Sequence, residues 1–178
     1  MQIIPYPEKS AWPALLSRPA LAARDLDALV QPVLDAVKLR GDQALLEYTA
    51  RFDRVNLNSV TVSAAEFEEA EALVDAGLKQ ALEDAARNIE TFHKAQQMVP
   101  RKITTTPGVT CWQKPVPIGR VGLYVPGGSA PLFSTVLMLA IPARIAGCGT
   151  RILCTPPMAN GKVHPAVLVA AKLTGVTS

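Results

Sequence analysis

The sequence predicts an α/β fold, with a helix-rich N-terminal region in residues 1–117 and the first part of an incomplete parallel sheet in residues 118–178. The composition changes near residue 100: every glycine except Gly41 and Gly77 lies beyond it, and no acidic residue follows Glu90. After residue 117 the order of patterns is strand, glycine loop, helix, strand, helix, which is typical of a parallel α/β sheet. Strands of such a sheet are buried on both faces, so the two or three strands present predict an unfinished sheet.

The composition bounds the class of protein. The chain has 178 residues, of which 49% are hydrophobic and 19% charged, so disorder and fibrous structure are excluded. A net charge of +3 is too small to indicate a nucleic-acid surface. No apolar run reaches the ~18–20 residues of a membrane span, and no signal peptide is recognisable. Three cysteines suit a reducing compartment, so we expect a soluble, cytoplasmic protein without nucleic-acid or membrane partners.

Helix signals dominate the first hundred residues. Apolar residues spaced by three and four predict a helix over 26–37, which Pro32 either kinks or shortens and Gly41 ends. Asp42 can cap a second helix that runs to Phe52. A short strand is predicted over 60–62.

Two further helices are predicted before Pro100. Ser63 and Glu66 form the pattern of a capping box, which starts a helix bearing Phe67, Ala70 and Val74. Residues 78–92 form the cleanest amphipathic pattern. The run of carboxylates Glu66, Glu68, Glu69 and Glu71 is most simply a solvated helix face.

The second half predicts strands, turns and helices in alternation. Residues 109–112, 118–125 and 151–154 are predicted strands. Residues 126–129 form a turn, and Ser134 or Thr135 can cap a helix that ends at Ala146. The last helix begins at His164-Pro165, where His164 can act as its cap, and ends near Gly175.

The junction of residues 124–131 is the most informative segment for binding. Gly127 and Gly128 let the backbone approach a ligand closely, and the amides of the following helix can face a phosphate. Tyr124 ends its strand at the carboxyl edge, where α/β proteins usually bind ligands. The same residues also fit a tight turn that needs positive φ and an aromatic core residue, because the segment is neither GxGxxG nor a P-loop.

Metal and nucleophile signals are weak. His93 and His164 are the only histidines, and Cys111, Cys148 and Cys154 show no metal-ligand spacing. We therefore expect no zinc site within this chain alone. No histidine lies near Cys154 in the sequence, so a cysteine-dependent oxidation of aldehydes is the weakest of the alternatives.

Residues 122–148, GLYVPGGSAPLFSTVLMLAIPARIAGC, closely resemble histidinol dehydrogenase. The resemblance continues through residues 152–157 (ILCTPP) and 170–176 (AAKLTGV). Upstream, residues 40–53 and 88–97 are similar to the family's N-terminal helical region. The resemblance therefore covers essentially the whole chain.

The resemblance implies a zinc-dependent homodimeric enzyme that oxidises L-histidinol to L-histidine through the aldehyde, using two NAD molecules in succession. The nucleotide would lie on an incomplete Rossmann-like domain. By similarity, its binding residues here would be Tyr124, Pro126, Gly127, Gly128, Pro156 and Phe52.

The family's general-base pair, zinc ligands and main substrate-binding residues fall beyond Ser178, where the family continues into a Gly-Gly-Ala-Gln-Ala segment. No catalytic residue is therefore expected on this chain, and the isolated chain is predicted to be inactive. The alternative is a non-catalytic module that binds a nucleotide or a protein partner.

Overall fold

A computed structural model describes residues 3–17, 26–127 and 131–177. The chain divides into two compact units, Met1–Gly41 and Asp42–Ser178. The first contains the short helices η1 (Lys9–Ala11) and α1 (Trp12–Leu16) and the longer α2 (Leu26–Arg40). The helix α2 continues through Pro32 and ends where Gly41 adopts a φ of +56° and donates its N–H to Val37 O. The predicted helix and its glycine stop are thus confirmed.

The second unit begins with three helices, α3 (Asp42–Phe52), α4 (Ala64–Leu73) and α5 (Ala76–Lys94). The predicted capping box is confirmed, because Ser63 Oγ accepts from the Glu66 N–H and the Glu66 carboxylate accepts from the Ser63 N–H. Asp42 is the first residue of α3 rather than the residue before it, so its predicted capping position is wrong. The strand predicted over 60–62 is also wrong, because this segment pairs with no described strand and remains a loop.

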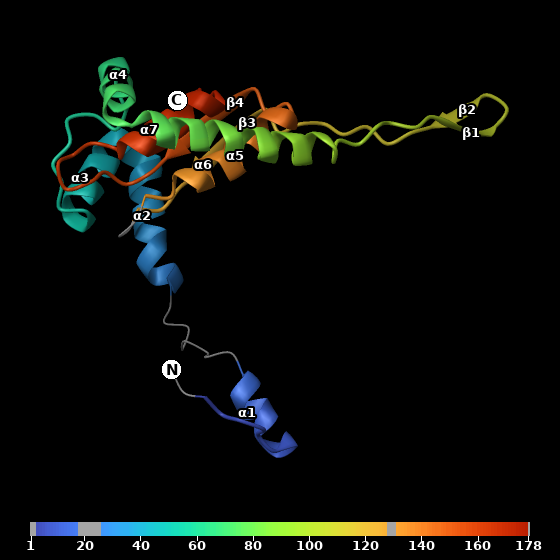
Figure 1. Ribbon diagram of the computed structural model, residues 1–178, viewed down its shortest axis with the longest axis horizontal. Helices are drawn as coiled ribbons and strands as arrows, with labels where there is room; N and C mark the ends of the chain where they lie inside the picture. Colours follow the sequence, from blue (N-terminus) through green and yellow to red (C-terminus); the bar gives the residue numbers. More distant parts are fainter. Residues whose placement is uncertain (1–2, 18–25, 128–130, 178) are drawn as a thin grey trace. The chain divides into compact units, whose positions relative to one another are not determined.

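The α/β part is the sequence β3 (Arg120–Tyr124), α6 (Phe133–Ile145), β4 (Thr150–Cys154) and α7 (Pro165–Thr174). The two strands are parallel, with Tyr124 opposite Cys154 at their carboxyl ends. The predicted helix cap is wrong for α6: Leu132 is the residue before the helix and supplies no side-chain cap, while Ser134 and Thr135 lie inside the first turn. Among the described residues, the parallel sheet has only these two strands, as the unfinished pattern predicted (Figure 1).

Helices cover one face of this sheet. The helix α6 packs on α5 and α7, and α7 also packs on α4. The buried core consists mainly of aliphatic side chains from these helices and from the residue directly after β3, namely Leu82, Val125, Val136, Leu137, Ile141, Val167, Ala170 and Ala171. Burial of each large aliphatic side chain contributes about 1.5–3 kcal/mol, which fixes α6 against the sheet and α7 against α6.

The opposite face of the sheet is exposed. Because side chains alternate along a strand, Leu123 and Leu153 face the helices while Gly122, Tyr124, Ile152 and Cys154 share the other side. Tyr124 is 65% exposed and Ile152 is 42% exposed. We call these four residues the open face. A parallel sheet normally has both faces covered, so the open face is an uncovered apolar surface within the described residues.

A two-stranded hairpin connects α5 to the sheet. Its antiparallel strands β1 (Ile103–Thr106) and β2 (Val109–Cys111) turn at Gly108, whose φ of +86° suits glycine. The hairpin is extended and its strand residues are all exposed (Figure 1). The strand β2 was predicted, whereas β1 was missed. Within the described residues, no helix is both long and apolar enough to span a membrane.

Candidate dinucleotide site

A cavity of about 320 Å³ lies at the carboxyl ends of β3 and β4, the edge where open α/β sheets bind ligands. It is bounded by the loop after β3, the beginning of α6, the loop between β4 and α7, and the beginning of α7. Its lining residues are Pro126, Gly127, Pro131, Leu132, Thr155, Pro156, Pro157, Met158, His164 and Val167.

Gly127 and Pro156 bring the two loops into close contact. A Cβ atom built on Gly127 would lie 2.6 Å from Pro156 Cγ, so one of the two residues would have to shift. Gly127 does not have a left-handed φ. The close approach of the β4–α7 loop, rather than turn geometry, is therefore what requires glycine at this position.

Polar groups in this cavity come mostly from the backbone and from His164 and Thr155. Nδ1 of His164 accepts the Ala166 N–H at 3.2 Å, so the predicted cap of α7 is confirmed. With Nδ1 accepting, Nε2 is the ring nitrogen that can donate a hydrogen bond. Leu132 supplies no side-chain cap for α6, and the Thr135 N–H already donates to Leu132 O at 3.0 Å. Within the described residues, the amides of Phe133 and Ser134 are the first-turn donors left at the positive end of the helix dipole. These groups suit an anionic ligand such as a phosphate.

The structure brings together three of the residues that the sequence predicted for NAD. Pro126, Gly127 and Pro156 line the same cavity. Tyr124 ends β3 at the same edge, but its side chain belongs to the open face and does not line the cavity. Phe52 lies at the end of α3, where its ring stacks on Tyr48 with centroids 5.5 Å apart, and it too is outside the cavity lining.

Gly128, the remaining predicted residue, lies outside the described residues. Sequence reasoning missed Thr155, Met158 and His164 as parts of this cavity. These residues lie between the end of a predicted strand and the start of the next helix, and this position could have indicated that they line a ligand site.

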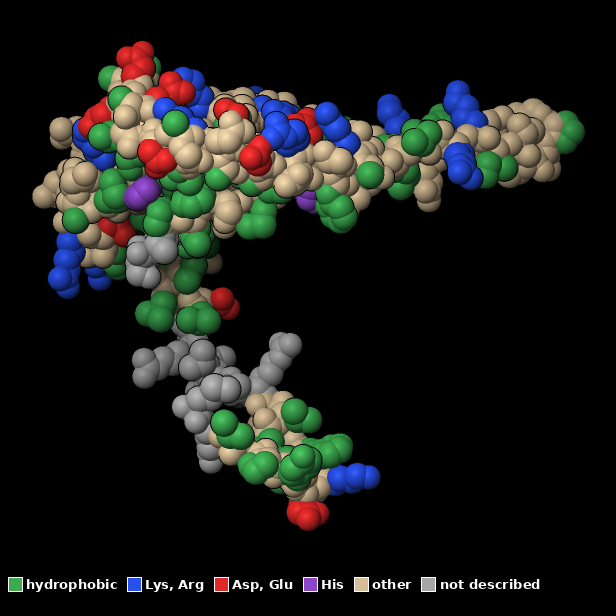
Figure 2. Space-filling model, in the orientation of Figure 1, with side chains coloured by type: hydrophobic (Ala, Val, Ile, Leu, Met, Phe, Trp, Pro, Cys, Tyr) green, Lys and Arg blue, Asp and Glu red, His purple; other side chains and the backbone are tan. Residues whose placement is uncertain are grey.

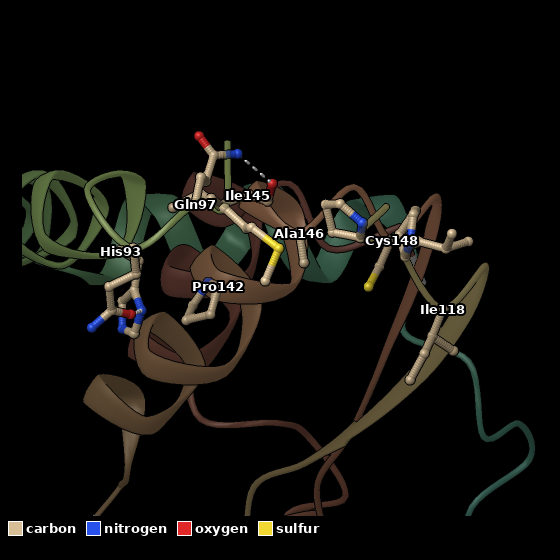
Figure 3. A pocket seen from close by; sticks show the side chains of 12 residues that line it. His93, Gln97, Ile118, Pro142, Ile145, Ala146 and Cys148 are labelled. Carbon is tan, nitrogen blue, oxygen red and sulfur yellow. Dashed lines mark hydrogen bonds between the residues drawn. The ribbon is translucent and has the colours of Figure 1, made fainter. Parts of the chain in front are cut away.

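A second cavity, of about 470 Å³, lies at the opposite end of the strands. Ile118 and Cys148, which precede β3 and β4, contribute to its wall (Figure 3). Gln97 Nε2 donates to Ile145 O at 3.1 Å across its rim (Figure 3). Its described lining is mostly proline and aliphatic, and it contains neither a lysine nor an arginine. The described lining of the cavity at the carboxyl ends has no lysine or arginine either, so its place at the carboxyl edge of the sheet, and not its charge, distinguishes it as a dinucleotide site.

Metal ligands do not cluster in the part of the chain that the structure describes. No group of three or more His, Cys, Asp or Glu residues lies together in those ranges. Cys148 is buried, while Cys111 and Cys154 are exposed free thiols. The described residues therefore do not fit a zinc centre, and no chemical step is assigned to zinc on this chain.

The sequence and fold were compared with known proteins. The family model for histidinol dehydrogenase matches residues 16–178. The chain belongs to the histidinol dehydrogenase family. It is 54% identical to the histidinol dehydrogenase of Bacteroides thetaiotaomicron over 177 residues, and 56% identical to that of Xanthomonas axonopodis pv. citri over 163 residues.

The fold agrees with this family. The crystal structure of histidinol dehydrogenase from Elizabethkingia anophelis matches 97% of the chain with a TM-score of 0.91 and 47% identity. That match covers 40% of the crystallised protein. The matches to the Bacteroides and Xanthomonas enzymes cover 99% and 90% of this chain and 41% and 38% of those enzymes. The chain thus spans about two fifths of the length of these relatives.

Proposed function

We propose that this chain supplies the NAD-binding part of a histidinol dehydrogenase, the enzyme that oxidises L-histidinol to L-histidine through the aldehyde in histidine biosynthesis. Family membership supports the activity, and the cavity at the carboxyl ends of β3 and β4 supports the binding site. The observation that carries the proposal is the contact between Gly127 and Pro156. Because Gly127 has no side chain, its backbone is directly accessible at the edge of the sheet where dinucleotides bind.

Different residues of the cavity would contact different parts of the dinucleotide. Backbone at Gly127 and the first two amides of α6 would hold a phosphate. Pro126 and Pro156 would contact apolar parts of the nucleotide. Tyr124 would contribute a ring at the same edge, and Phe52 remains a more distant member of the predicted set. Bound NAD supplies the hydride acceptor. The chain's own residues bind and orient it.

Catalysis by the isolated chain is not proposed. The resemblance assigns the general base and the zinc ligands to regions of the family beyond the part matched here. Mixing the chain with NAD, Zn²⁺ and L-histidinol should give no NADH absorbance at 340 nm. The complete enzyme is proposed to be a cytoplasmic homodimer, as the family resemblance implies.

NAD binding tests the proposal directly. Calorimetric titration of the chain with NAD should show saturable binding, and Gly127→Ala should weaken it by about tenfold or more, because the new methyl group displaces Pro156. Gly119→Ala is the matched control, since its Cβ would meet no atom within 4 Å. Urea unfolding of both variants separates lost binding from lost folding. Absent binding, or equal binding by both variants, contradicts the proposal.

A non-catalytic module that binds a protein partner is the second candidate. The exposure of Tyr124 and Ile152 on the open face favours it. This candidate predicts that the chain is monodisperse and unfolds cooperatively without binding NAD. Light scattering coupled to size-exclusion chromatography, followed by the NAD titration, distinguishes the two functions.

A further inference from the structure

The loop between β4 and α7 forms one wall of the proposed NAD cavity, through Thr155, Pro156, Pro157, Met158 and His164. We propose that Glu69 on α4 and Lys162 in this loop are positioning residues, which hold the loop in the shape that binds the dinucleotide. This inference rests on the proposed function.

Lys162 and Glu69 meet although they are far apart in the sequence. The Lys162 ammonium donates to both carboxylate oxygens of Glu69, with Nζ–Oε1 and Nζ–Oε2 distances of 2.8 and 2.6 Å. Both side chains are 47% exposed. Acidic and basic side chains mix over α4 in Figure 2, rather than forming a patch of one sign. The pair therefore ties one point of the loop to a helix outside the sheet.

The backbone carries this restraint from Lys162 to the cavity wall. The Met158 N–H donates to Lys162 O at 2.9 Å, and the Gly161 N–H donates to Met158 O at 2.8 Å. Asn160 Oδ1 accepts the Lys162 N–H at 3.0 Å. Residues 158–162 thus form a closed turn, and fixing Lys162 also fixes Met158, which lines the cavity.

Apolar side chains of the segment that follows α3 also contact this turn. Gly161 has a φ of +80°, and a Cβ built there would lie 3.4 Å from Leu57 Cδ2 and 3.6 Å from Val55 Cγ1. Val55 is buried. The turn therefore rests on the segment that follows α3 and is held from the side by α4, so two parts of the helical region determine where the loop lies.

A second ion pair made by α4, this one with α7, provides a matched control. Lys172 Nζ lies 2.7 Å from Glu71 Oε2, with side chains 53% and 45% exposed. It joins α4 to α7 and involves no residue of the loop. Removing it therefore eliminates an exposed Lys–Glu ion pair of the same type but leaves residues 158–162 held in place. Exposed ion pairs add little to global stability, so the effect of Glu69 and Lys162 should be local.

Hydrogen exchange and NAD titration of four variants test the proposal. Glu69→Gln and Lys162→Gln should each speed exchange of the Met158 and Gly161 amides by about fivefold and weaken NAD binding by a similar factor. Glu71→Gln and Lys172→Gln should leave both measurements within about twofold of the parent chain. The double variant E69K/K162E should recover the slow exchange, because it restores the pair with the charges exchanged.

The outcomes separate this inference from the proposed function. Equal exchange in Glu69→Gln and Glu71→Gln overturns the positioning role. The positioning role is also overturned if the parent chain binds NAD and the Glu69→Gln and Lys162→Gln variants show faster amide exchange but the same affinity for NAD. If the parent chain does not bind NAD, the proposed function fails. The exchange contrast then still decides whether Glu69 and Lys162 hold the loop.

Discussion

The guanidinium of Arg151 donates to the carbonyl oxygen of Gly175, with an Nη2–O distance of 2.5 Å. The same guanidinium donates through Nη1 to Cys148 O, also at 2.5 Å. Gly175 has a φ of +69° and ends α7, where the carbonyl groups carry the negative end of the helix dipole. Arg151 therefore joins the start of β4 to the end of α7 through charge-assisted hydrogen bonds.

Replacing this guanidinium should destabilise the second unit. Arg151→Met keeps the apolar stem but removes both donors, so we expect the free energy of unfolding to fall by about 2 kcal/mol. Urea denaturation followed by circular dichroism measures the change. Arg120→Met, at the exposed start of the neighbouring strand, is the control. Equal losses in the two variants would show that the bridge contributes nothing specific.

Ser63→Ala should destabilise α4 by about 1 kcal/mol, because it removes the oxygen that accepts the Glu66 N–H. Ser134→Ala is the control: the sequence predicted a cap at Ser134, but the structure places it inside the first turn of α6. Thermal or urea unfolding should therefore separate the two alanine variants. A larger effect at Ser134 would contradict the described helix start.

The pKa of the Glu71 carboxyl should lie below its ordinary value. The hydrogen bond from Lys172 lowers its pKa below the ordinary value of 4.5. A carboxyl whose folded pKa is lowered stabilises the fold above its unfolded pKa, and loses that contribution as the pH falls through the folded pKa. The contribution of this pair should thus be complete at neutral pH, and it should be lost progressively as the pH falls from 4.5 through the lower pKa of the folded state.

Carboxyl ¹³C NMR measures the titration of Glu71. In Lys172→Met the midpoint should move upward, and in the parent chain added salt should move it in the same direction by screening the pair. An unchanged midpoint in the variant would exclude Lys172 as the cause of the low pKa.

The open face should promote self-association. Ile152→Thr reduces the exposed apolar area in the middle of this face and should raise the dissociation constant of self-association by about fivefold. Leu73→Thr, at the end of α4 and 65% exposed, is the control for a general change in surface hydropathy. Sedimentation at several concentrations measures both. Equal shifts would place the contact elsewhere.

Local patterns predicted most of the helices because their information lies within a few residues. The Ser63–Glu66 box and the spacing of apolar residues in α5 define these helices. The strand β1 was missed because its Ile-Thr-Thr-Thr sequence lacks a buried apolar alternation, and it forms by pairing with β2. The wrong strand over 60–62 had suitable β-branched residues but no described partner strand.

The site could be predicted only in part. Pro126 and Gly127 adjoin a strand end, and the resemblance added Pro156, which lines the same cavity. The pairing of Glu69 with Lys162 depends on how α4 packs on α7, and no local pattern reveals it. The interpretation of the carboxylate run as a solvated face therefore missed the ion pairs of Glu69 and Glu71.

Because Gly127 and Pro156 are in contact, the residues tolerated at one of these positions depend on the residue at the other. A side chain at position 127 and a pyrrolidine ring at position 156 cannot share this space. We therefore expect substitutions at the two positions to be coupled. A larger residue at 127 becomes acceptable only after the residue at 156 has become smaller or its loop has moved.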